Sequence, residues 1–135
     1  PAPSVDSTQT VEFRSADGSA HLHLLMAGLC VAARRGFERA DALAFADKYF
    51  VDKNIYHKEN ASVIEKLPKL PSSCWGSAEA LEKSRAVFEA KGVFTPQVID
   101  GLAKRLKSYD DMHLSEKLFG KEEEIKNLVE EYLYC

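Results

Sequence analysis

A carboxylate and a guanidinium, Glu12 and Arg14, stand two residues apart near the start of the sequence. Polar and apolar residues alternate over residues 8–13, which predicts a short, half-exposed strand. Residues two apart on a strand point to the same side, so both side chains can face one cleft. A carboxylate there suits a divalent metal, although one carboxylate alone cannot hold Mg²⁺ or Mn²⁺. Without further context, such a pair is most often a solvated ion pair with no function.

The four histidines lack metal-ligand spacing. His21 and His23 are two residues apart, and on a helix such a pair does not share a face as an i, i+4 zinc pair does. We expect them to pack or to mark a polar boundary. We expect His57 and His113 at the surface.

The three cysteines, Cys30, Cys74 and Cys135, form an odd set without C-x-x-C spacing. This predicts neither a disulfide framework nor a cysteine zinc site, and it favours a reducing, cytoplasmic setting. Cys30 lies in an apolar segment and is predicted to be a buried, inert thiol.

Length and charge limit the class of protein. The chain has 135 residues, of which 45% are hydrophobic, and this suits a single domain over residues 1–135. Lys plus Arg number 18 against 21 Asp plus Glu, and the two signs are interspersed, so no nucleic-acid partner is expected. The longest apolar run, residues 22–33, is too short to cross a bilayer, so no membrane partner is expected either. The start Pro1-Ala2-Pro3 is interpreted as a cut, and residues 1–7 are expected to be disordered.

Helical periodicity predicts a mainly α fold with the one short amino-terminal strand. The predicted helices cover residues 20–35, 38–51 and 77–90, a segment opening at Thr95-Pro96, and residues 121–134. Ser19, Ser77 and Thr95 are the expected N-caps. Residues 52–73 contain two Leu-Pro pairs, which predict a connector with at most a short helical turn near residues 62–66. Trp75 is placed in a loop, where it anchors the loop to the core or lines a nucleotide pocket.

The segment 20–35 is apolar on nearly every side. A helix of this kind must be covered all round, whereas a small independent bundle usually contains amphipathic helices. The composition therefore indicates that more protein surrounds this helix than the chain itself provides.

Several blocks resemble the glutamine synthetase family. Residues 10–20 (TVEFRSADGSA) and 25–29 (LMAGL) are similar to that family's R-x-E-x-R pattern, Asp turn and A-G-L helix. Residues 70–73 (LPSS), 78–82 (AEALE) and 92–95 (GVFT) resemble three further blocks, in the same order and at similar separation. The resemblance spans about residues 8–108. Residues 110–135 are interpreted as a subfamily-type helical extension.

The resemblance implies a helical carboxy-terminal fragment of an α+β glutamine-synthetase catalytic domain. Such enzymes phosphorylate the side-chain carboxylate of glutamate with ATP and let ammonia displace the phosphate, with Mg²⁺ or Mn²⁺ bound. By matched position, Glu12 is implied as a metal ligand and Arg14 as the catalytic cation that contacts the substrate or the transferred phosphoryl group. The first Arg of the pattern is Thr10 here, which leaves amines other than ammonia open as substrates.

The implied partners are the remainder of the parent enzyme, glutamate with ammonia or another amine, and further copies in a homo-oligomer. Alone, the 135-residue chain is predicted to be inactive and to bind neither metal nor nucleotide. Its strand over residues 10–14 is predicted to be disordered or to pair with another copy. The alternative is an autonomous helical interaction domain without catalysis, which would bind a protein partner through surfaces such as the apolar first helix.

Overall fold

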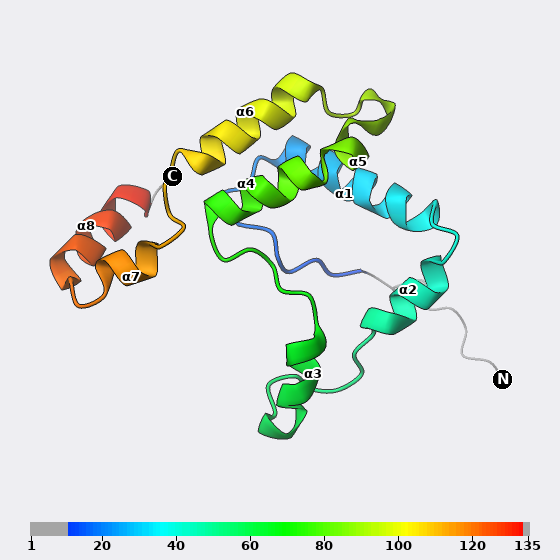
Figure 1. Ribbon diagram of the computed structural model, residues 1–135, viewed down its shortest axis with the longest axis horizontal. Coiled ribbons are helices and arrows are strands. Elements are labelled where there is room, and N and C mark those ends of the chain that lie inside the picture. The colour runs from blue at the N-terminus through cyan, green and yellow to red at the C-terminus, as the bar shows by residue number, and fades with distance from the viewer. Residues whose placement is uncertain (1–10, 134–135) are drawn as a thin grey trace.

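The computed structural model describes residues 11–133, which are mainly helical (Figure 1). This confirms the predicted helical character. The predicted strand is not shown, because residues 11–14 form no strand and residues 8–10 lie outside the described range. Residues 1–7, which the sequence predicts to be disordered, lie outside this range as well. The helices run in the order α1 (Leu22–Phe37), α2 (Ala42–Tyr49), η1 (Lys58–Asn60), α3 (Ala61–Lys66), α4 (Cys74–Lys83), α5 (Arg85–Glu89), η2 (Ala90–Gly92), α6 (Pro96–Lys107), α7 (Leu114–Leu118) and α8 (Glu122–Tyr132).

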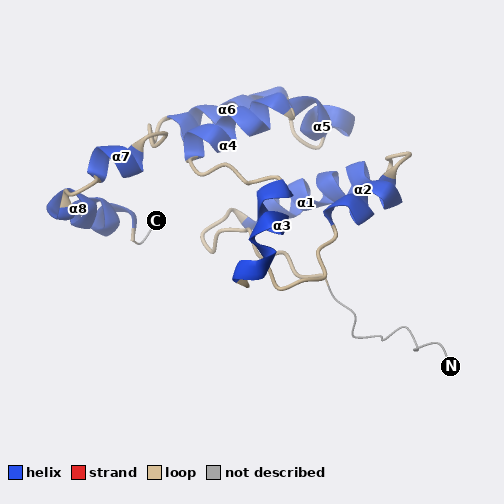
Figure 2. Cartoon of the chain, turned by 60° about the horizontal axis from the view of Figure 1, so that its bottom comes forward, coloured by secondary structure: helices blue, strands red, loops and turns tan. Residues whose placement is uncertain are grey.

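Two antiparallel helices form the centre of the fold. α4 and α6 lie side by side in both ribbon views, and the end of α6 lies beside the start of α4 (Figures 1 and 2). Ala78 of α4 and Ala103 of α6 are buried, and their small side chains allow the two helices to approach closely. Ile99 of α6 forms one buried cluster with Val31 of α1 and with Phe94. Partly buried hydrophobic side chains pack against this cluster: Leu24, Ala27, Leu81, Val87, Phe88 and Val98.

α1 is far less covered than its composition predicts. Val31 is its one buried residue, whereas Leu22 and Met26 are 64% and 53% exposed. Cys30 is exposed as well, so its prediction as a buried thiol is wrong. The reason is that α1 packs against the core through one face, and residues 11–133 do not enclose the other faces.

The N-cap of α6 is the predicted one, and the N-cap of α1 is not. Thr95 caps α6 as predicted, with its Oγ1 accepting from the Val98 N–H at 3.4 Å. At α1 the N-cap is His21 and not Ser19, because the Nδ1 of His21 accepts from the Leu24 N–H at 3.4 Å. Of the two roles expected for His21, packing or a polar boundary, the structure shows the polar boundary.

The N-cap of α4 lies four residues before the predicted one. Ser73 is the N-cap and its Oγ accepts from the Gly76 N–H at 2.9 Å, while Ser77 lies inside the helix and donates its hydroxyl to the Ser73 carbonyl at 2.9 Å. Trp75 consequently lies in α4 and not in a loop. The predicted single helix is also interrupted at Ser84, which leaves helical geometry (φ −99°, ψ 4°) and separates α4 from α5.

The remaining elements follow the predicted pattern with shifted ends. α2 is shorter than residues 38–51, α3 lies at the predicted helical turn, α8 matches residues 121–134 closely, and α7 was not predicted. Within residues 11–133, no helix is long and apolar enough to cross a membrane.

Replacing Ile99 by Ala is expected to lower the free energy of unfolding by about 2–5 kcal/mol, because the side chain is fully buried in the cluster. The matched control is Ile125→Ala on α8, where the side chain is 41% exposed and the expected loss is below about 1 kcal/mol. Urea unfolding followed by circular dichroism measures both. Equal losses would contradict the placement of the core.

Candidate functional site

Glu12 and Arg14 contact each other in the extended segment that precedes α1. Arg14 Nε lies 2.9 Å from Glu12 Oε1, and Arg14 Nη2 donates to Glu12 Oε2 at 3.0 Å, which is a bidentate pair. The two side chains therefore lie on the same side of the chain, as their spacing predicts. They are open to solvent, with 81% of the Arg14 side chain and 69% of the Glu12 side chain exposed.

The described residues do not complete a metal site around Glu12. Both of its carboxylate oxygens contact Arg14, and residues 11–133 contain no group of three or more His, Cys, Asp or Glu side chains that could hold a metal ion. A divalent cation needs several oxygen ligands. Thr10, which replaces the first Arg of the pattern, lies outside the described residues.

A turn at Asp17 joins this segment to α1. Asp17 Oδ1 accepts from the Ser19 hydroxyl at 2.6 Å and from the Ser19 N–H at 2.7 Å, and the Ala20 N–H donates to the Asp17 carbonyl at 3.2 Å. The hydroxyl bond first, and the backbone bond second, hold the pKa of Asp17 below its ordinary value. The turn sets the direction in which the chain carrying Glu12 and Arg14 leaves the helix.

The histidines do not form a site within the described chain. The rings of His21 and His23 lie 5.7 Å apart between centroids, and both side chains are exposed. His57 and His113 are exposed, as predicted, and His57 Nδ1 lies 3.9 Å from Glu59 Oε1.

Trp75 does not anchor a loop; it lies in α4 and contacts side chains of α4 and α6. Its Nε1 donates to Glu79 Oε1 at 3.2 Å, and Lys107 Nζ lies 5.8 Å from its ring centroid. Lys107 also pairs with Glu82 at 2.7 Å, so this corner ties the end of α6 to α4.

An apolar groove of about 430 Å³ opens between α1, α4 and α6. Its lining includes Leu24, Leu25, Leu81, Phe88, Leu102 and Leu106. His21, at the start of α1, also lines it. His21 is the one titratable side chain among its lining residues, and its Nδ1 caps α1, so the groove suits packing more than chemistry.

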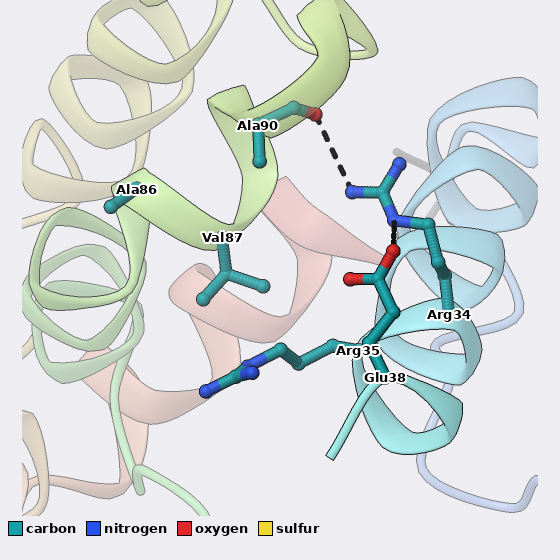
Figure 3. A pocket seen from close by; sticks show the side chains of 6 residues that line it. All are labelled: Arg34, Arg35, Glu38, Ala86, Val87 and Ala90. Atoms are coloured by element: carbon teal, nitrogen blue, oxygen red, sulfur yellow. Dashed lines mark hydrogen bonds and ion pairs between the residues drawn. The ribbon is translucent and has the colours of Figure 1, made fainter. Parts of the chain in front are cut away.

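A smaller pocket of about 250 Å³ lies where the end of α1 meets α5 (Figure 3). Arg34 crosses it, donating from Nη2 to the Ala90 carbonyl at 3.4 Å, and its Nε lies 3.7 Å from Glu38 Oε1. Arg35 and Val87 complete the wall. The contacts of Arg34 fasten α1 to α5, which makes this pocket structural.

Asp111 is a positioning residue that sequence reasoning missed. Its Oδ2 accepts from the Cys74 N–H at 2.6 Å and its Oδ1 from the Trp75 N–H at 3.0 Å. A carboxylate at the amino end of a helix satisfies free N–H groups and complements the helix dipole. Asp111 lies 37 residues after Cys74, so no local pattern signals this cap.

Replacing Ser19 by Ala is expected to raise the pKa of Asp17 toward its ordinary value of 3.8, because the hydroxyl donor is lost while the backbone donor stays. Since the pKa is lowered in the folded chain, the turn is stabilised above pH 3.8 and loses this as pH falls through the folded value. Carboxyl-detected NMR titration measures the shift. Ser15→Ala is the control and leaves the pKa unchanged, whereas an unchanged value in Ser19→Ala would contradict the turn geometry.

Comparison with known proteins identifies one family. A family model described as glutamine synthetase, catalytic domain, matches residues 1–119 of the chain. The match runs past Ser108, where the resemblance in the sequence fades. Neither the curated proteins nor the solved structures gave a match. Because the family model covers most of its 135 residues, this chain belongs to the glutamine synthetase family.

Proposed function

We propose that the chain is the carboxy-terminal part of a glutamine-synthetase-like, ATP-dependent ligase. The proposed reaction joins ammonia or another amine to the γ-carboxylate of glutamate through a γ-glutamyl phosphate. The observation that carries the proposal is the bidentate pair of Glu12 and Arg14, which lies inside the region matched by the catalytic-domain model.

Arg14 is the proposed catalytic residue. A guanidinium offers two parallel N–H donors that fit a carboxylate or a phosphoryl group, and Arg14 already presents this fork to Glu12 at 2.9 and 3.0 Å. An exposed ion pair contributes only about 0–1 kcal/mol, so exchanging this contact for ligands of a complete site costs little. The accessibility of both side chains supports such an exchange.

ATP and Mg²⁺ or Mn²⁺ are the proposed cofactors of the complete enzyme, with Glu12 as one metal ligand. Residues 11–133 contain no group of three or more side chains that could hold a metal ion, so the other ligands and the nucleotide site would come from the remainder of the parent enzyme. The other proposed partners are glutamate, the amine, and further copies in a cytoplasmic homo-oligomer that serves nitrogen metabolism. Thr10 removes a cation from the pattern, and this keeps the identity of the amine open.

One observation favours the second candidate, a helical interaction domain without catalysis. The apolar groove and the exposed side chains of α1, Leu22 and Met26, present a hydrophobic surface that a protein partner could cover. The same surface is expected of a fragment whose parent enzyme packs against it. Reading the gene upstream separates the two candidates, since a ligase needs several hundred further residues with the remaining metal ligands.

In the complete enzyme, Glu12→Gln and Arg14→Gln are each expected to lower kcat/KM for ATP-dependent γ-glutamyl hydroxamate formation by about 100-fold or more, because each removes a charge that acts on the reacting groups. Glu116→Gln on α7, an exposed carboxylate to which no role is assigned, is the control and leaves the rate unchanged. Full activity in both Glu12→Gln and Arg14→Gln would overturn the proposal.

The isolated chain gives an independent measurement. Titration calorimetry with ATP and Mn²⁺ is expected to show no saturable binding, because one carboxylate cannot hold the metal. Tight, metal-dependent binding would show that the site is complete within the 135 residues.

A further inference from the structure

α7 and α8 form a carboxy-terminal arm, defined here as residues 114–132 (Figure 1). Neither helix contains a buried residue, and the buried cluster of the fold lies among α1, α6 and Phe94. Hydrophobic burial is the main stabilising term in folding, so the arm adds little to the stability of the core. Its position must therefore depend on a few specific contacts.

Asp111 makes two hydrogen bonds between the base of the arm and the core. It lies three residues before α7 and accepts the N–H groups of Cys74 and Trp75, the first two residues of α4, at 2.6 and 3.0 Å. Desolvation opposes ionisation of this carboxyl, yet the bonds from Cys74 and Trp75 outweigh it and hold the pKa of Asp111 below its ordinary value. The carboxylate is thus charged at neutral pH, when it binds the helix end most strongly.

The adjoining residue gives the arm a pivot. Asp110 has a positive φ of 46°, a left-handed conformation that is uncommon for a residue other than glycine, and it makes the turn between α6 and α7. Lys117 of α7 pairs with Asp110 at 3.3 Å, which ties the start of the arm to the pivot itself. Tyr109, on the core side of the pivot, contacts Tyr132 with ring centroids 6.0 Å apart.

We propose that Asp111 is a latch that fixes the base of the arm on the amino end of α4. Opening this latch, together with separation of the Tyr109 and Tyr132 rings, frees the arm to move as one unit about Asp110 while the core stays folded. Release of the arm and unfolding of the core are separable. The latch satisfies N–H groups at the amino end of α4, whereas the buried residues of α4 and α6 lie about one turn or more away from that end of the helix pair. This conformational device does not depend on the proposed ligase activity.

The test is ¹⁵N relaxation and amide hydrogen exchange on the full 135-residue chain with Asp111→Ala and Asp111→Asn. In the wild type, the amides of α6 and α8 are expected to report the same tumbling time. In Asp111→Ala, α8 is expected to tumble faster than α6, and the Cys74 and Trp75 amides to exchange about fivefold faster or more, the size of a typical amino-terminal cap. Asp111→Asn keeps one acceptor and is expected to lie between the two.

Asp110→Asn is the matched control, since it removes one negative charge at the neighbouring position and Asn tolerates positive φ. It is expected to keep the shared tumbling time and the slow exchange of the Cys74 and Trp75 amides. Three results would overturn the proposal: independent tumbling of α8 in the wild type, unchanged tumbling of α8 in both Asp111 variants, or a loss of protection in α6 equal to that at the start of α4.

Discussion

The close packing of α4 against α6 is the contact on which the described fold depends. Alanines at Ala78 and Ala103 let the two helices approach, and Ile99 then reaches Val31 of α1 across the cluster. Fully burying a side chain such as Ile99 is worth about 1.5–3 kcal/mol, whereas each exposed ion pair is worth about 0–1 kcal/mol. The ion pair of Lys107 with Glu82, which joins these two helices, therefore aligns them more than it stabilises them.

This small centre explains why so much apolar surface stays open. One face of α1 packs on the core, while Leu22, Met26 and the groove between α1, α4 and α6 face solvent. A helix that is apolar on all sides is stable in water only when other protein covers it. The chain belongs to the glutamine synthetase family, and the proposal that it is part of a larger ligase would account for this excess of apolar surface.

The pair of Glu12 and Arg14 lies apart from that centre, and the Asp17 turn connects the two. Both carboxylate oxygens of Glu12 contact Arg14, but the two side chains are mostly exposed to solvent and are not enclosed by other described residues. An electrostatic site becomes effective when water is excluded and the charges are held in a low dielectric, and neither condition exists at side chains this exposed. Within residues 11–133, the pair of Glu12 and Arg14 therefore lacks the enclosure that the proposed chemistry requires.

Local patterns were sufficient for the helical class and for the α6 start at Thr95-Pro96. These features depend on residues within one or two turns of each other, where capping and periodicity act directly. The capping of α4 by Asp111 and the exposure of Cys30 could not be predicted in the same way. Asp111 caps α4 from 37 residues away, and the coverage of α1 depends on which distant helices reach it. Burial and long-range hydrogen bonds are properties of the packed chain, so only the tertiary structure could determine them.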